Sequence, residues 1–369
     1  MRDGVADCDR PAPDEDIGEP ARRAVLTYPC AAPPQPGDAV EVADGVLWLR
    51  LPLPFSLDHI NVWALRDGDG WTLVDSGLAT PASEDGWLKA FAGPLGGRPV
   101  RRMIVTHMHP DHVGTAGWIC DRFDAPLLMT RLEYLTCRSL VADTGRPAPE
   151  QGVRFLRAAG WDEAQLQDYR DRFGMFGRGV RDFPDGFERM TDGDVLNIDG
   201  RGWRVVGGNG HCPEHACLLR EDDQVFISGD QVLPKISSNV SVWPTEPKAD
   251  PLSDWIASLA KLKREVPADA LVLPSHGEPF LGLHGRLDAL ARGHEASLKR
   301  LRRRLREPKR AVDVFSTLFA RPVGRGDFGM ATGESLAHLH CLLTRGEAVK
   351  ETDADGVDWW RAIEAEEAA

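Results

Sequence analysis

The sequence predicts an α/β fold in which two β-sheets pack as a sandwich covered by helices, followed by a small helical C-terminal domain. Three observations support this prediction. Short runs rich in Val, Leu, Ile and Trp alternate with helical periods over about 240 residues. Candidate metal-ligating side chains stand at the ends of several of these runs. After residue 283 the strand-like runs give way to a region that is almost wholly helical in pattern.

Composition places the chain among ordinary globular proteins. Its 369 residues are 42% hydrophobic and 27% charged, and this length favours one large domain plus a small one. No run approaches the roughly 18 to 20 apolar residues of a membrane span, and the acidic first residues contain no apolar signal-peptide core. We therefore expect a cytoplasmic protein with no membrane partner. The net charge of −13 disfavours general association with nucleic acid, and the seven cysteines contain no CxxC pair.

The N-terminal segment 1–37 is predicted to be a disordered leader, because it is rich in Pro, Ala and acidic residues and shows neither hydrophobic period. The catalytic domain is expected to span 38–283. Its first half contains three predicted strands, a helix and a further buried strand. In chain order these elements are 46–53, 59–66, 71–74, 82–91 and 103–106.

A helical insertion is predicted inside this domain at 131–183, where Leu and Phe residues recur at helical spacings between Gly breaks. After the insertion the pattern returns to strands, with one amphipathic helix before the last of them. These elements are 195–198, 203–206, 216–219, 225–227, the helix 250–265, and 270–274.

The C-terminal domain, 284–369, is predicted to be winged-helix-like. Three helical stretches are followed by a strand signal, a turn and a second strand signal, in the layout of a winged-helix hairpin. The second and third helices are expected near 312–319 and 334–344, and the hairpin at 348–361.

The strongest chemical signal is a His-x-His-x-Asp-His motif. It places His107, His109, Asp111 and His112 within six residues of a loop that follows a buried strand. Imidazole nitrogen and carboxylate oxygen are ligands that Zn(II), Fe(II) and Mn(II) accept. A tight loop can direct such side chains towards two adjacent ions, so the motif indicates a metal site.

Three further candidate ligands stand at strand ends or in Gly-rich turns. His211 lies in Gly-Asn-Gly-His, Asp230 in Ser-Gly-Asp, and His276 in Ser-His-Gly. With the motif they make seven ligands. Structural histidines in loops would explain these residues less well, because separate segments supply complementary ligand types.

These four elements, in this order, resemble the metallo-β-lactamase superfamily, and the resemblance covers about residues 40–285. It implies the αββα sandwich of that superfamily. It also implies a ligand assignment with one shared carboxylate. One metal would take His107, His109 and His211, the other Asp111, His112 and His276, with Asp230 bridging.

The resemblance implies two divalent metal ions, with zinc favoured and iron or manganese as alternatives. A metal-bridging hydroxide would be the nucleophile, and Asp111 would orient it as well as bind metal. The carboxylate at Asp230 is similar to that of hydroxyacylglutathione hydrolases and ribonucleases of the superfamily. The β-lactamase-like endoribonuclease branch also joins this domain to a C-terminal winged helix.

Three other residues are candidates for supporting roles. Asp75, in Val-Asp-Ser-Gly, resembles the family aspartate that supports the ligands from behind, which we favour over a turn-capping role. His215 is expected to support the site by hydrogen bonding rather than to act directly. Trp243 is a candidate wall of the substrate pocket, and its alternative role is ordinary loop packing.

We favour a hydrolase acting on a small thioester, ester or lactone. One alternative is an endoribonuclease that cuts single-stranded RNA and uses the basic run 299–310 as an electrostatic guide. That run is better explained as a solvated helix face beside an acidic domain. A second alternative is a winged-helix regulatory protein with the metal domain as a sensor, but seven intact ligands count against it.

Overall fold

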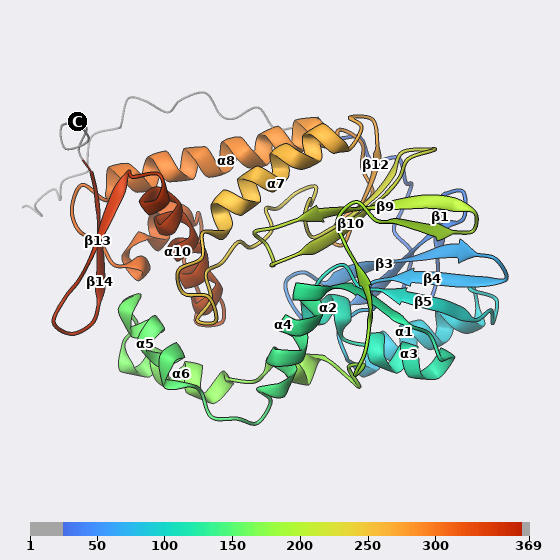
Figure 1. Ribbon diagram of the computed structural model, residues 1–369, viewed down its shortest axis with the longest axis horizontal. Coiled ribbons are helices and arrows are strands. Elements are labelled where there is room, and N and C mark those ends of the chain that lie inside the picture. Colours follow the sequence, from blue (N-terminus) through green and yellow to red (C-terminus); the bar gives the residue numbers. More distant parts are fainter. Residues whose placement is uncertain (1–24, 364–369) are drawn as a thin grey trace, which may run out of the picture.

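A computed structural model describes residues 25–363 and shows two facing sheets with helices on their outer sides (Figure 1). The first sheet has seven strands in the order of the chain, antiparallel from β1 to β4 and parallel from β4 to β7. Its strands are β1 (Val40–Ala43), β2 (Val46–Pro52), β3 (His59–Asp67), β4 (Gly70–Val74), β5 (Val100–Ile104), β6 (Leu127–Thr130) and β7 (Glu188–Met190).

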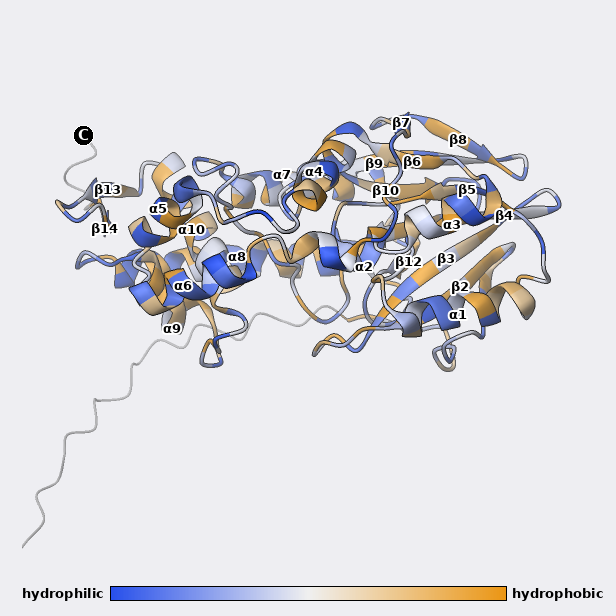
Figure 2. Cartoon of the chain, turned by 90° about the horizontal axis from the view of Figure 1, so that it is seen from below, coloured by the Kyte–Doolittle hydropathy of each residue, from blue (hydrophilic) through white to orange (hydrophobic). Residues whose placement is uncertain are grey.

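The second sheet has five strands in the order β12-β11-β10-β9-β8, and only the β11–β12 pair is parallel. Its strands are β8 (Val195–Ile198), β9 (Arg201–Gly208), β10 (His215–Arg220), β11 (Val225–Gly229) and β12 (Leu271–Pro274). Strands of both sheets carry much of the hydrophobic colour in Figure 2. The predicted α/β sandwich is confirmed.

The two sheets share a core. Trp48 and Trp63 of the first sheet lie in one buried cluster with Trp203 and Ile227 of the second. Each large apolar side chain buried in this way contributes about 1.5–3 kcal/mol, so the cluster holds the sheets together.

Helices cover the outer faces of both sheets. A buried cluster, which we call the outer core, lies between each sheet and its helices. That of the first sheet includes Trp87, Ile119 and Tyr134, and that of the second includes Trp255 and Leu287. The helices of the sandwich are α1 (Pro81–Ala92), α2 (Pro110–Val113), α3 (Ala116–Phe123) and α7 (Pro251–Glu265).

The predicted insertion is helical in the structure. It consists of α4 (Arg131–Ala142), α5 (Glu150–Ala158), α6 (Glu163–Arg172) and the 3-10 turn η1 (Phe176–Gly179). The helix α6 begins with a capping box in which Asp162 accepts from the backbone of Gln165 and the Gln165 side chain accepts in return. Within the insertion, α4 packs against the first sheet through Tyr134 and Cys137, and η1 adds Phe176 to the same cluster.

The C-terminal region combines helices with a two-stranded antiparallel hairpin. Its elements are α8 (Leu283–Arg304), η2 (Ala311–Val314), α9 (Phe315–Leu318), α10 (Phe328–Thr344), β13 (Ala348–Thr352) and β14 (Asp358–Ala362). Leu339 and Trp360 of this region share a core with Phe226 of the second sheet. The helical C-terminal domain is thus present, and its winged-helix character stays a prediction.

The predicted leader, 1–37, is corrected in its last part. Thr27 exchanges two backbone hydrogen bonds with Leu281, at 3.2 and 2.8 Å, and Leu26 packs against the core. These contacts were missed because the pairing is with a segment some 250 positions away, which no local period reveals. Residues 1–24 of the leader lie outside the described residues. Among the described helices, none has the length and apolarity needed to span a bilayer.

Candidate metal centre

The His-x-His-x-Asp-His motif begins three residues after the end of β5, and its last two ligands, Asp111 and His112, lie in α2. Pro110 occupies the first turn of α2, where a missing N–H costs nothing, and His109 stands at the N-cap. The chain therefore turns sharply between the buried strand and the helix. This turn brings the four side chains together, and the ring centroids of His107 and His112 lie only 3.9 Å apart.

Three histidines from two loops converge, and we call them the first triad: His107, His109 and His211. The His107 Nε2 atom lies 2.9 Å from His109 Nδ1 and 3.2 Å from His211 Nε2. One nitrogen from each ring lies within 4.8 Å of the others, a spacing that suits a single metal ion.

A second set of donors lies beside the first, and we call it the second triad: Asp111, His112 and His276. Asp111 Oδ2 lies 3.7 Å from His112 Nε2 and 3.4 Å from His276 Nε2. Their ligand atoms also lie within 4.8 Å of one another.

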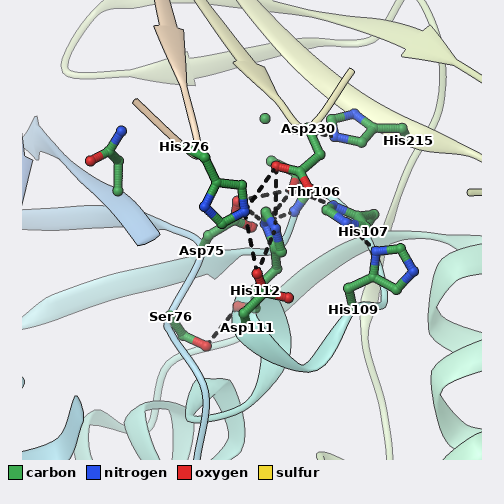
Figure 3. Close-up of polar contacts among 12 residues, drawn as sticks. Asp75, Ser76, Thr106, His107, His109, Asp111, His112, His215, Asp230 and His276 are labelled. Atoms are coloured by element: carbon green, nitrogen blue, oxygen red, sulfur yellow. Dashed lines mark hydrogen bonds and ion pairs between the residues drawn. The ribbon is translucent and has the colours of Figure 1, made fainter. Parts of the chain in front are cut away.

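Asp230, at the end of β11, lies between the two triads (Figure 3). Its Oδ1 is 3.6 Å from His112 Nε2 and 3.5 Å from His276 Nε2, both in the second triad. Its Oδ2 is 3.5 Å from His211 Nε2, in the first. The structure thus brings all seven sequence-predicted ligands together, and their individual roles stay predictions.

Two buried atoms of the centre test whether a cation fits. His112 Nε2 and Asp230 Oδ1 are buried and lack a hydrogen-bond partner among the described residues. Buried polar atoms are seldom left in this way, because the cost is about 1–3 kcal/mol each. Both atoms face the remaining donors, and imidazole with carboxylate is the donor set of Zn, Fe and Mn sites. The residues present therefore fit two divalent ions.

The electrostatics of the two triads differ. Burial lowers the pKa of His107 well below its usual value, with the neighbouring His112 adding to the effect, so this imidazole stays neutral. Burial acts on His112 too, but the carboxylates of Asp75, Asp111 and Asp230 outweigh it and raise the pKa of His112 well above its usual value. Neutral imidazole is the ligand form, and the surplus of carboxylates favours a cation in the second triad.

Asp75 supports the second triad from the end of β4. Its Oδ2 lies 2.8 Å from His112 Nδ1 and 2.9 Å from the Thr106 hydroxyl, and its Oδ1 accepts from the Thr106 backbone at 2.8 Å. Asp75 has φ of 61°, a left-handed conformation that Asp tolerates better than most residues. This contact orients the His112 ring so that Nε2 faces the centre.

His215 supports Asp230. Its Nε2 accepts from the Asp230 backbone N–H at 3.1 Å, and burial holds the pKa of His215 well below its usual value. A Cβ at Gly229 would lie 2.5 Å from this ring, and φ there is +52°. The glycine of Ser-Gly-Asp therefore lets the imidazole approach the backbone of Asp230.

The supports of His211 and His276 were not predicted. The Nδ1 of His276 lies 2.8 Å from the carbonyl of His59, and the His59 Nε2 accepts from Gly277 N–H at 3.0 Å. His211 Nδ1 lies 2.7 Å from the carbonyl of Asn239. Backbone carbonyls of any residue can play this part, so residue identity carried no signal.

Trp243 lies in the loop that holds Asn239, with 41% of its surface exposed. This loop contacts α10, where Val242 N–H donates to the Gly333 carbonyl at 3.0 Å. Exposure of a large aromatic side chain on this loop is compatible with a pocket wall, and that role stays a prediction.

Family models identify the class of protein that this fold and site define. Residues 56–276 match the metallo-beta-lactamase superfamily, and 298–363 match the metallo-beta-lactamase-like C-terminal domain. Because the first match covers more than half of the chain, the protein belongs to the metallo-beta-lactamase superfamily of hydrolases. The predicted family is confirmed.

Individual relatives are consistent with this membership. A beta-lactamase domain protein from Burkholderia ambifaria is 40% identical, covers 92% of this chain and 98% of its own, and superimposes with a TM-score of 0.83. A probable metallo-hydrolase, YflN of Bacillus subtilis, is 26% identical over 68% of this chain and 91% of its own. An atrochrysone carboxyl ACP thioesterase of Aspergillus fumigatus is 24% identical over 63% of this chain and 41% of its own. The chain thus spans about two fifths of the length of that curated thioesterase.

Proposed function

We propose that the protein is a dinuclear metal-dependent hydrolase that cleaves a small thioester, ester or lactone. The observation that carries this proposal is the position of Asp230. Its two oxygens face different triads, at 3.5 Å from His211 and 3.5 Å from His276. A shared carboxylate is the arrangement that holds two cations about 3.5–4 Å apart.

When bound, two divalent ions would activate water as a nucleophile and polarise the carbonyl of the substrate; zinc is favoured over iron or manganese. The six other ligands would hold the pair through neutral imidazoles and the carboxylate of Asp111. The Asp111 side chain is 21% exposed, against 10% for Asp230 and 4% for His276. Of the two carboxylates at the centre, that of Asp111 is therefore better placed to orient the attacking water and to accept its proton at an oxygen.

A small carbonyl substrate is supported by the names of the relatives. Two atrochrysone carboxyl ACP thioesterases match the chain at 24% and 28% identity. A thioester needs no protein nucleophile when an activated water attacks its carbonyl. Its thiolate is also a good leaving group. We extend the thioesterase class, not the particular substrate, to this protein.

The basic run 299–310 bears on the ribonuclease alternative. Arg302 lies 3.6 Å from Glu347, and Arg310 forms a bidentate pair with Asp313. Arg303, Arg304 and Arg306 are exposed. Part of the run is thus engaged within the C-terminal domain, which favours the solvated-face explanation over an RNA guide.

An activity screen tests the proposal. Protein loaded with zinc would be assayed on thioesters, lactones, phosphodiesters and short RNAs, with a chelator-treated sample as control. We expect about two ions per chain and chelator-sensitive turnover of a thioester, ester or lactone. Turnover by metal-free protein would refute metal dependence. Binding of these compounds without turnover would favour the sensor alternative.

A matched variant separates the two enzyme classes. Arg302, Arg303, Arg304 and Arg306 would be changed together to Gln, which leaves the metal ligands intact. Ester turnover should stay within about threefold and show little salt dependence. RNA cleavage would instead show a log–log salt slope of roughly −0.7 per phosphate contacted, and the variant would flatten it. Strong, salt-sensitive RNA cleavage by the parent protein would make the ribonuclease the better assignment.

A further inference from the structure

Glu133 is a fully buried acid in the first turn of α4, at the start of the insertion. Its two carboxylate oxygens accept from two different backbone segments. Oε2 accepts from Met108 N–H at 2.9 Å, and Oε1 accepts from Glu214 N–H at 2.7 Å. Both hydrogen bonds are of ordinary length and each uses a different oxygen.

The two segments are the loops that carry the first triad. Met108 stands between His107 and His109, and Glu214 stands three residues after His211. One carboxylate therefore ties together the loops that supply all three histidines. The contact reaches the ligands through the backbone and leaves their imidazole nitrogens free.

The contact between α4 and the second loop is reciprocal. The Glu214 carboxylate accepts from Leu132 N–H at 2.9 Å, and the Glu214 carbonyl accepts from the Thr130 hydroxyl at 2.7 Å. The start of α4 is thus bonded to the loop of His211 by three hydrogen bonds. The orientation of Glu133 follows from this docking.

A purely packing role would not favour an acid at this position. Burial raises the pKa of Glu133 to about 7, so its charged form is costly at neutral pH. An apolar residue would fill the space without that cost, but would leave the buried N–H of Met108 and the partly buried N–H of Glu214 without their acceptor. A glutamine offers one acceptor oxygen and turns N–H groups towards the other donor. Only a carboxylate satisfies both loops at once.

We propose that Glu133 is a positioning residue for the first triad, setting the affinity of that triad for its metal by holding the His107–His109 loop against the His211 loop. The proposal rests on the dinuclear centre of the proposed function. It assigns the insertion a specific task at that centre, which α4 performs through a single side chain. The second triad, which Glu133 does not contact, is unaffected by it.

The test compares metal binding by the parent protein and Glu133→Gln. Metal-free protein would be titrated with Co²⁺ and Zn²⁺, following heat and the visible absorption of bound Co²⁺. We expect the variant to bind one ion as the parent does and the other at least about tenfold more weakly, the usual cost of losing such a support. The absorption of the affected ion should be that of the histidine-only triad.

Tyr134→Phe is the matched control on the same helix. Tyr134 is buried, and its hydroxyl donates to the Pro184 carbonyl at 3.0 Å and accepts from Arg138, so the hydrogen bonds that the substitution removes are to neither ligand loop. It should lower the melting temperature while leaving both metal affinities unchanged. If Glu133→Gln does not fold, Glu133→Asp keeps both oxygens, shortened by one methylene, and should weaken the same ion.

The outcomes separate this proposal from the proposed function. Failure of the parent protein to bind two ions would refute the dinuclear centre itself. Two ions bound by the parent and bound equally well by the Glu133 variants would overturn only the role of Glu133. Equal weakening of both ions would also overturn it, because the effect would then be general rather than confined to the first triad.

Discussion

The two triads of the candidate centre are supported by different parts of the molecule. The second triad is held by the first sheet, through the Asp75 side chain at the end of β4 and the His59 carbonyl on β3. The first triad has one contact from the end of the first sheet, the Thr106 hydroxyl at 3.0 Å from His107 Nδ1, and is otherwise held from outside the sheets, by Glu133 of the insertion and by the Asn239 carbonyl. The sandwich alone can thus orient the second triad, whereas the first triad also needs the insertion and the loop of Asn239, which packs on α10.

The loop that carries Asn239 is itself attached to the C-terminal domain. The Asn239 side chain donates to Glu334 Oε2 at 3.2 Å, and Val242 N–H donates to the Gly333 carbonyl at 3.0 Å. A Cβ at Gly333 would lie 2.7 Å from the Cβ of Ser241, so only glycine permits this approach. The C-terminal domain is therefore connected to His211 through Asn239, whose side chain contacts Glu334 and whose carbonyl contacts the His211 ring.

The largest effect is expected for Asp230→Ala, because this carboxylate faces both triads. Metal content should fall from about two ions per chain towards zero, and turnover should drop by more than about a hundredfold. Elemental analysis and steady-state kinetics would measure these losses. His276→Ala is the matched variant and should chiefly empty the second triad. Equal metal loss in the two variants would contradict the bridging position of Asp230.

A smaller, selective effect is expected for Asp75→Asn. The amide cannot accept from His112 and from both Thr106 donors, so the His112 ring loses its fixed orientation. The affinity of the second triad should fall about 10- to 100-fold and that of the first triad by less, because Asp75 reaches His107 only through the Thr106 hydroxyl, which lies 3.0 Å from His107 Nδ1. Titration with Co²⁺ would resolve the two ions. Weakening confined to the first triad would break the proposed division of support.

All seven residues that the structure brings together at the candidate centre can be singled out from the sequence, because each lies in a short motif beside a strand. The supports could be predicted only where a side chain marked them, as at Asp75 and His215. Glu133 gave no local signal, since it is 25 positions from Met108 and 81 from Glu214. Its role depends on a tertiary contact that neither helical period nor spacing encodes.

The fold shows the same limit. Periodicity predicted the insertion, the five strands of the second sheet and β2 to β5 of the first, because alternation and helical spacing are local properties. The strands β1, β6 and β7 of the first sheet were missed, because runs of three or four residues are too short to show a period. The helix expected near 334–344 begins at Phe328 in the structure, where Gly329 and Gly333 weaken the local helical signal and packing against Ser241 compensates. The backbone pairing of Thr27 with Leu281 was missed for the same reason.

The smallest effect on the metals, and the clearest on stability, is expected for Glu334→Gln. Burial raises the pKa of Glu334 from 4.5 to about 7, so the folded protein binds this proton more tightly than the unfolded chain does. The stability that this proton provides is therefore present below about pH 4.5 and is lost as pH rises through about 7. At pH 8 the neutral variant should be more stable by up to about 3 kcal/mol, and at pH 5 by much less. Denaturant unfolding of metal-free protein at the two pH values would measure this difference. Glu351→Gln, at an exposed acid of β13, controls for net charge.

Glu334→Gln should have little effect on metal binding. Because a glutamine oxygen still accepts from Asn239, metal affinity of the first triad should change by less than about threefold. A tenfold loss there would mean that the charge of Glu334, rather than the docking of the loop on α10, orients His211.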